Sequence, residues 1–231
     1  MIRFQPVSSD VHVLRHPVLD VNSTLVVGRE CALLVDTLSC ASQAIRLAEA
    51  VREVTGLPVQ VVNTHDHFDH VFGNATIARL LEVADFWAHP FVVTRLSRDA
   101  AEIRADAYRW CLARDLAIAE EVRDTEVLVP NRPVASRVDI DLGGVVASVR
   151  HLGPAHTRGD LVVAAAGVLV AGDLVEEGAP PDTDGADLAG WPLALDALLP
   201  EATGPVVPGH GAVVDADFVV RQRAELAALT T

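Results

Sequence analysis

Residues 61–74 read V-V-N-T-H-D-H-F-D-H-V-F-G-N, which places three histidines and two aspartates within six consecutive positions. The valine-rich segment 59–62 directly before the cluster predicts a buried strand. Gly73 and Asn74 after it are typical of a turn. The cluster therefore lies where a strand ends and a loop begins, and proteins of the α/β class often place functional residues at such points.

Four side chains of this cluster are candidates for binding metal ions. In an extended chain His65 and His67 point to the same side, so both imidazoles can reach one cation. Asp69 and His70 follow where the chain turns and can face a second cation. Asp66 has the opposite parity and is a less suitable ligand. Histidine together with carboxylate suits zinc, and iron or manganese are also possible.

Three later segments each present a metal-binding residue type where an apolar strand meets a tight loop. They read G-P-A-H-T-R-G-D (153–160), L-V-A-G-D-L-V (169–175) and V-V-P-G-H-G (206–211), and the residues concerned are His156, Asp173 and His210. Functional sites of α/β sheets are built at such junctions. We therefore expect these three side chains to contribute to the same site as the first cluster.

Taken in this order, the motifs H-x-H-x-D-H, G-x-x-H-T-x-G-D, G-D and P-G-H-G resemble those of the metallo-β-lactamase-fold hydrolases. The segments V-N-S-T-L-V-V and C-A-L-L-V-D-T are similar to the first strands of that family. The resemblance implies an α/β fold with four layers, an αβ/βα sandwich of two mixed β-sheets flanked by helices. We expect one such domain over residues 1–231.

The resemblance also implies a site for two zinc ions per chain. The implied ligands are His65, His67 and His156 for the first ion, Asp69, His70 and His210 for the second, and Asp173 as a bridge between them. Two metal ions about 3.5–4 Å apart can acidify a shared water and polarise a carbonyl at the same time. The catalytic carboxylates would be Asp69 and Asp173, either of which could accept or relay a proton.

The expected function is hydrolysis of a small thioester, ester or lactone through a metal-bridging hydroxide. Aspartate at position 173 resembles the hydroxyacylglutathione hydrolases (glyoxalase II), the lactonases and the thioesterase-like members, whereas the best-known β-lactamases of the fold carry cysteine or no bridging carboxylate there. The chain also contains no lysine, which many β-lactamases use to bind the drug carboxylate, although arginine could replace it. The alternatives are a metal-dependent oxidoreductase on the same scaffold and a promiscuous β-lactamase.

Composition restricts the possible partners. The formal net charge of −14 argues against nucleic acids and anionic membranes, because both are bound through clustered Lys and Arg. The longest apolar stretch, residues 161–171, is too short to span a bilayer. The expected partner is a small-molecule substrate, and the oligomeric state is left open.

The cysteines and the N-terminal residues indicate the compartment. Cys31, Cys40 and Cys111 are odd in number and widely spaced, so they predict no disulfide framework. The first ten residues contain no apolar stretch of the signal-peptide type. A cytoplasmic location is the resulting expectation.

Substrate contacts are expected mainly from the helical pattern of residues 97–124, which contains no proline or glycine and could cap the metals. Within it, Arg104 and Tyr108 could bind a substrate carboxylate or carbonyl, and an ordinary solvated helix face is the alternative. Trp191, which follows the acidic loop 182–190, is another candidate. His16 in the first hairpin is the fourth candidate for a substrate contact.

Three further side chains are expected to support the ligands without touching the metals. They are Thr64, Thr157 and Asp160. Thr157 and Asp160 could fix the loop that carries His156, and Asp160 could accept a hydrogen bond from a backbone amide or an imidazole.

Overall fold

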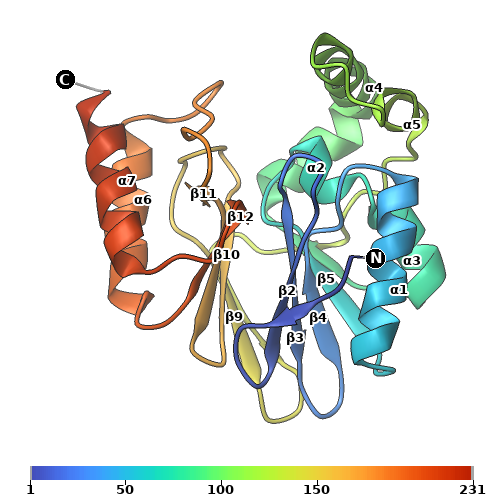
Figure 1. Ribbon diagram of the computed structural model, residues 1–231, viewed down its shortest axis with the longest axis horizontal. Helices are drawn as coiled ribbons and strands as arrows, with labels where there is room; N and C mark the ends of the chain where they lie inside the picture. Colours follow the sequence, from blue (N-terminus) through green and yellow to red (C-terminus); the bar gives the residue numbers. More distant parts are fainter. Residues whose placement is uncertain (1, 230–231) are drawn as a thin grey trace.

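The alternating strands and helices assemble into two β-sheets that lie face to face, with helices on both outer sides (Figure 1). The computed structural model describes residues 2–229. This arrangement is the αβ/βα sandwich expected from the sequence, and that prediction is confirmed.

The first sheet contains the N-terminal strands in sequence order. They are β1 (Gln5–Pro6), β2 (Val11–Arg15), β3 (Asn22–Val27), β4 (Ala32–Val35), β5 (Val59–Val62), β6 (Phe86–Ala88) and β7 (Arg132–Pro133). The pairs from β1 to β4 are antiparallel, and those from β4 to β7 are parallel. The parallel strands end at the same edge, so the loops after β4, β5 and β6 begin close together.

The second sheet contains the C-terminal strands. Their spatial order is β12 (Val206–His210), β11 (Val168–Glu176), β10 (Leu161–Ala165), β9 (Val146–His151) and β8 (Arg137–Asp141). Only β11 and β12 are parallel among these neighbouring pairs. Both sheets are therefore mixed.

Successive side chains of each strand point to opposite faces of its sheet, so the apolar residues pack in three layers: one between the two sheets and one between each sheet and its outer helices. Leu25 and Leu34 face the helices α1 (Ala41–Val54) and α3 (Asn74–Leu81), whereas Val26 and Leu33 face the second sheet. The outer side of the second sheet packs against α6 (Gly190–Leu198) and α7 (Ala216–Ala228), and the 3₁₀ turn Leu199–Glu201 follows α6. Each helix covers its sheet with an apolar face.

The single helical pattern expected over residues 97–124 forms two helices. The first is α4 (Pro90–Ala113), and the second is the short α5 (Ala119–Asp124). Helix α4 begins at Pro90, ahead of the pattern that starts at residue 97, because His89 accepts a hydrogen bond from the Phe91 amide and Pro90 occupies the first turn. It ends because Asp115 adopts a left-handed conformation with φ 52°.

Two local features near the motifs differ from the expected ones. The short helix α2 (Phe68–Val71) starts inside the histidine cluster, so the turn expected there is helical. Strand β11 continues to Glu176, beyond the junction of strand and loop expected at Asp173, with irregular pairing to β12 around Gly172. Asp173 therefore lies within a strand and not at its end. No helix among residues 2–229 combines the length and hydropathy needed to cross a bilayer.

Candidate metal centre and its cavity

Side chains from both sheets meet at one edge of the sandwich. The first sheet contributes His65 and His67 directly after β5, together with Asp69 and His70 on α2. The second sheet contributes His156 from the loop between β9 and β10, Asp173 from β11, and His210 from the end of β12. All seven residues that the motifs singled out as ligands are thus brought together.

These seven residues form two groups that could each hold a metal ion. The first comprises His65, His67, His156 and Asp173, and the second comprises Asp69, His70 and His210. Within each group, the candidate ligand atoms all lie within 4.8 Å of one another. The shortest separations are 3.0 Å between His156 Nε2 and His67 Nδ1, and 3.3 Å between His70 Nε2 and His210 Nε2.

Asp173 touches both groups. One carboxylate oxygen, Oδ1, lies 3.2 Å from His70 Nε2, and the other, Oδ2, lies 3.5 Å from His65 Nε2 and 3.4 Å from His210 Nε2. Glycine at position 209 makes room for this carboxylate, because a Cβ there would overlap Asp173 Oδ1. The G-D and P-G-H-G motifs therefore depend on each other sterically.

The polar atoms at the centre fit bound cations. His65 Nε2 and Asp173 Oδ1 are buried and have no hydrogen-bond partner among the residues described. Buried polar atoms are normally paired, so this pair of unsatisfied acceptors needs an explanation. A cation between imidazole nitrogens and carboxylate oxygens supplies one, and this donor set suits zinc.

The ring nitrogens that point away from the centre are held by hydrogen-bonding partners. The contacts are His65 Nδ1 to Thr64 Oγ1 at 2.9 Å, His70 Nδ1 to Asp36 Oδ2 at 2.8 Å, His156 Nδ1 to the Asp182 carbonyl at 3.2 Å, and His210 Nδ1 to the Leu19 carbonyl at 2.7 Å. When the Nδ1–H of each ring donates to such a partner, the Nε2 lone pair faces the centre.

Asp36 connects three elements behind the centre, and it was not predicted from the sequence. It is 2% exposed and accepts hydrogen bonds from the Thr64 amide at 2.8 Å, from Thr64 Oγ1 at 2.7 Å and from His70 Nδ1 at 2.8 Å. The segment C-A-L-L-V-D-T could have indicated this role, because an aspartate there directly follows a buried strand.

Burial keeps two histidines of the first group neutral. It lowers the pKa of His65 well below its usual value of 6.5, and it lowers the pKa of His156 to about 4, although Asp173 opposes both shifts. Their lone pairs are therefore free at neutral pH.

The second group has the opposite tendency. Burial disfavours the charged form of His70, but the carboxylates of Asp173, Asp36 and Asp69 together raise its pKa well above 6.5. Burial likewise opposes the charged form of His210, yet Asp173 and then Asp69 raise its pKa to about 10. A cation that enters this group replaces these protons as the partner of the carboxylates.

Thr157 and Asp160, which were expected to fix the loop that carries His156, are hydrogen-bonded to each other. The Asp160 carboxylate accepts hydrogen bonds from the Thr157 amide at 2.8 Å and from Thr157 Oγ1 at 2.6 Å. Burial raises the pKa of Asp160 to about 7. Thr64, the third residue expected to give such support, contacts His65 directly.

A cavity of about 800 Å³ opens above the centre. Its floor includes His67, Asp69, Asp173 and His210. One wall is a face of α4, and the opposite wall is the loop 177–184. Residues of α4 thus lie beside the centre, and a role of the helical region as a cap over the metals stays a prediction.

The four side chains expected to contact substrate do not line this cavity. Arg104 donates to the Thr125 carbonyl at 3.1 Å and Tyr108 donates to Glu120 at 3.1 Å, so both lie on the face of α4 that packs against α5. Trp191 is fully buried, with its ring centroid 5.3 Å from that of His156. His16 is 8% exposed, and its Nδ1 accepts from the Val18 amide.

Other residues of the same segments reach the cavity instead. Ile103, Ala107, Trp110 and Arg114 follow one face of α4 at spacings of three and four residues, and Leu19 replaces His16 in the first turn. The stripe of Ile103, Ala107 and Trp110 could have indicated this face, because it has helical periodicity. The sequence prediction instead chose Arg104 and Tyr108 for the groups they could bind, and these two residues lie on the neighbouring face of α4.

Asp66 belongs to neither metal-binding group. It is 1% exposed, and neither carboxylate oxygen has a hydrogen-bond partner among the residues described. Its counter-ion is Arg95 of α4, whose Nη1 lies 3.1 Å away. The residue between the two histidines thus connects the floor of the cavity to its α4 wall.

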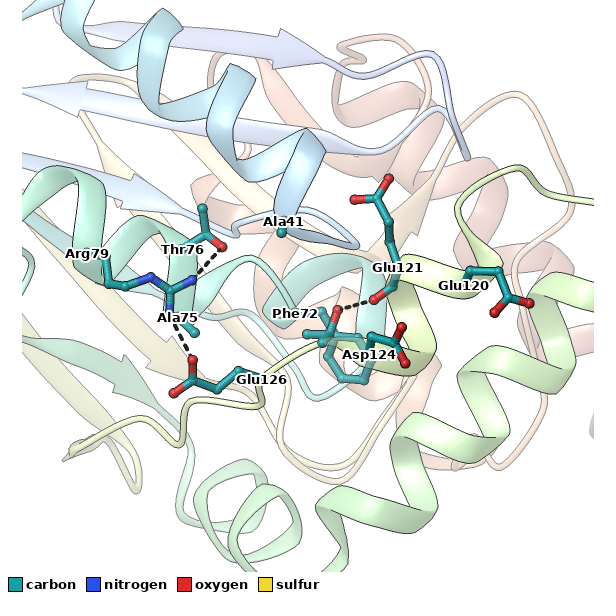
Figure 2. A pocket seen from close by; sticks show the side chains of 10 residues that line it. Ala41, Phe72, Ala75, Thr76, Arg79, Glu120, Glu121, Asp124 and Glu126 are labelled. Atoms are coloured by element: carbon teal, nitrogen blue, oxygen red, sulfur yellow. Dashed lines mark hydrogen bonds and ion pairs between the residues drawn. The ribbon is translucent and has the colours of Figure 1, made fainter.

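A second hollow of about 440 Å³ lies between α1, α3 and α5 (Figure 2). Arg79 crosses it, with Nη1 2.8 Å from Glu126 and Nη2 3.4 Å from Thr76 Oγ1 (Figure 2). Glu120, Glu121 and Asp124 make it acidic, but no histidine or cysteine lines it. The metal-binding chemistry is therefore confined to the first cavity, as far as residues 2–229 are concerned.

Comparison with known proteins defines the class of this chain. The profile of the Metallo-beta-lactamase superfamily matches residues 16–210, which span all seven motif residues. The chain therefore belongs to the metallo-beta-lactamase superfamily, and the expected enzyme class, a zinc-dependent hydrolase of this superfamily, is confirmed at the family level. No curated protein sequence matches the chain.

Solved structures show the same fold at low sequence identity. A metallo-beta-lactamase from Pontibacter korlensis is 21% identical with a TM-score of 0.78, covering 98% of this chain and 99% of that one. TMB-1 is 18% identical with a TM-score of 0.76, covering 100% and 99%. FIM-1 from Pseudomonas aeruginosa, in a mono-zinc form, is 19% identical with a TM-score of 0.74, covering 99% and 96%.

Proposed function

We propose that this protein is a binuclear metal-dependent hydrolase that cleaves an acyl bond of a small molecule. The single observation that carries the proposal is the position of Asp173, whose two oxygens contact histidines of both groups. One carboxylate shared by two histidine groups is an arrangement that can hold two adjacent cations.

We assign His65, His67 and His156 to the first ion, Asp69, His70 and His210 to the second, and Asp173 to both. Two bound zinc ions would supply Lewis-acid polarisation of a carbonyl and acidification of a water. The chain's own residues orient and protect this chemistry: Thr64 and Asp36 fix the tautomers of His65 and His70. Asp69 and Asp173 both line the cavity, so either carboxylate could accept a proton from the reacting water.

A β-lactam is the substrate that the structural comparisons favour. The similar structures named above include proteins described as metallo-beta-lactamases, and each is covered by this chain over nearly its whole length. This reverses the order expected from the sequence, in which β-lactam hydrolysis was the alternative. The cavity of about 800 Å³ is of the size that accommodates a drug-sized molecule.

A small thioester, ester or lactone is the second candidate. The observation that favours it is the carboxylate of Asp173 between the two groups, a feature that resembles the glyoxalase II, lactonase and thioesterase-like members of the superfamily. Both candidates use the same carbonyl chemistry and differ in the leaving group, which is an amine in one case and a thiolate or alkoxide in the other.

The test is a hydrolysis assay of zinc-loaded protein with metal analysis of the same sample. A chromogenic cephalosporin, an aryl thioester and an aliphatic lactone serve as substrates, and His67→Ala protein serves as the control for each. We expect about two zinc ions per chain and hydrolysis of at least one substrate. The preferred substrate decides between the candidates. One iron per chain together with oxygen consumption would overturn the proposal in favour of an oxidoreductase.

A further inference from the structure

The cavity above the metal centre contains one guanidinium without a carboxylate partner among the residues described. Arg95 lines the cavity but is paired with the buried Asp66. Arg114 lines it too, and its side chain contacts Trp110: the guanidinium carbon lies 3.8 Å from the ring centroid and Nη1 lies 3.4 Å from the carbonyl oxygen. Because the chain has no lysine, no ammonium side chain competes with Arg114 in this role.

An apolar surface leads from the metal centre to Arg114. The ring of Trp110 lies 5.6 Å from that of Phe68, and Phe68 directly follows the candidate ligand His67. Ile103 and Ala107 line the same cavity on the same face of α4. A flat apolar group can pack on this surface while an anionic group attached to it reaches the guanidinium.

Asp106 on the α4 wall is paired with Arg109, whereas the wall formed by the loop 177–184 is acidic. Glu177, Asp182 and Asp184 line it, and none of the three forms an ion pair with a residue in the described part of the chain. A second negative charge on a ligand would face these carboxylates and be repelled. One anionic group near Arg114 is therefore favoured, and two are not.

We propose that Arg114, held against Trp110, binds the single anionic group of the substrate. The substrate class is an acyl compound with an aromatic or other flat apolar body and one carboxylate. This inference rests on the proposed function, because it takes the metal centre as the place of reaction. Selectivity for anionic substrates is thus assigned to Arg114, at the C-terminal end of α4.

Binding of a matched pair of probes tests the inference without turnover. The probes are para-nitrobenzoate and its neutral analogue para-nitrobenzamide, titrated into zinc-loaded protein while tryptophan fluorescence is recorded. We expect para-nitrobenzoate to bind more tightly, and Arg114→Gln to weaken its binding about tenfold or more, because charge-assisted hydrogen bonds are among the strong ones. Binding of para-nitrobenzamide should change less than about twofold, because it offers no carboxylate to the guanidinium.

Two further variants separate a specific role of Arg114 from a general effect of positive charge on the helix. Arg98→Gln removes an exposed arginine from the same helix outside the cavity and should leave both probes unaffected. Arg114→Lys should retain part of the selectivity, because lysine keeps the charge but lacks the planar fork. If the metal centre alone holds the carboxylate, Arg114→Gln will bind para-nitrobenzoate as well as the unaltered protein does, and the inference is overturned.

Turnover distinguishes failure of the inference from failure of the proposed function. The substrates are the acetyl thioester of thionitrobenzoate, which carries a carboxylate, and that of para-nitrothiophenol, which does not. Arg114→Gln should raise KM for the first about tenfold and leave both kcat values and the second KM unchanged. Charge-selective binding of the probes without hydrolysis of any acyl substrate would contradict the proposed function and leave the anion site intact.

Discussion

The floor and the walls of the cavity differ in how firmly their side chains are held. In the floor and directly beneath it, Asp173, His65 and His70 are each at most 5% exposed, and His65 and His70 have a partner at their outer ring nitrogen. On the walls, Arg114 and Asp184 are exposed. Buried groups with several partners keep one arrangement, whereas exposed side chains can reorient. We therefore expect the floor to determine reactivity and the walls to determine the choice of substrate.

The largest effect is expected on the floor itself. His67→Ala should remove a ligand of the first ion and lower hydrolysis by more than about a hundredfold, because losing even a partner behind a ligand costs roughly 10–100-fold. Zinc content and the rate on the best substrate are measured together, with circular dichroism to confirm the fold. A variant that loses zinc but keeps most of its activity would contradict the assignment.

Asp36→Asn tests the layer behind the floor. Asparagine has one acceptor oxygen, so it cannot accept from both the Thr64 amide, which uses Oδ1, and His70 Nδ1, which uses Oδ2, and zinc affinity should fall roughly 10–100-fold. Competition with a chromogenic chelator measures this affinity. Asp196→Asn, which removes an exposed carboxylate far from the cavity, is the matched control and should bind zinc normally. Equal zinc affinity of the two variants would show that Asp36 does not orient His70.

The contact between floor and wall is tested with Arg95→Gln. This change leaves Asp66 as a buried carboxylate without its counter-ion, and we expect a loss of about 1–3 kcal/mol in the free energy of unfolding. A value at this level fits the partial exposure of Arg95, because fully buried pairs lose about 3–5 kcal/mol. Urea unfolding should show that Asp66→Asn in the same chain restores part of the loss. Additive effects of the two changes would mean that the residues are not coupled.

The pH dependence of stability is a further test of the floor. The pKa of Asp160 is raised from its usual 3.8 to about 7 in the folded protein, mainly by burial. The folded state therefore keeps a proton that the unfolded state has released, and this contribution to stability is present below about pH 4 and lost as the pH rises through about 7. Metal-free protein should thus lose stability relative to Asp160→Asn between about pH 4 and pH 7. A constant difference between the two urea midpoints would refute this.

The smallest effect is expected on the acidic wall. Asp184→Asn removes one exposed charge from the side of the cavity opposite Arg114. At about 0.15 M salt the Debye length is about 8 Å, so para-nitrobenzoate should bind less than about twofold more tightly. The gain should increase when the salt concentration is lowered. A larger effect that does not depend on salt would mean that this wall contacts the ligand directly.

The candidate ligands could be predicted because their environment is local in the sequence. His65, His67 and His210 each lie at or near the point where an apolar strand ends, and the distance between motifs matters little once the sheets form. Asp36 has the same local pattern, yet it was missed because its role depends on His70, which lies 34 positions away.

By itself, the sequence determined the fold class and the types of residue at the floor of the cavity, because strand periodicity and strand ends are local properties of the chain. Only the tertiary structure decided which face of α4 meets the cavity. Arg104 and Arg114 are equally cationic, but packing against α5 turns the first away and leaves the second at the cavity. The rotation of a helix about its axis depends on contacts that are distant in the sequence, and a local pattern does not contain them.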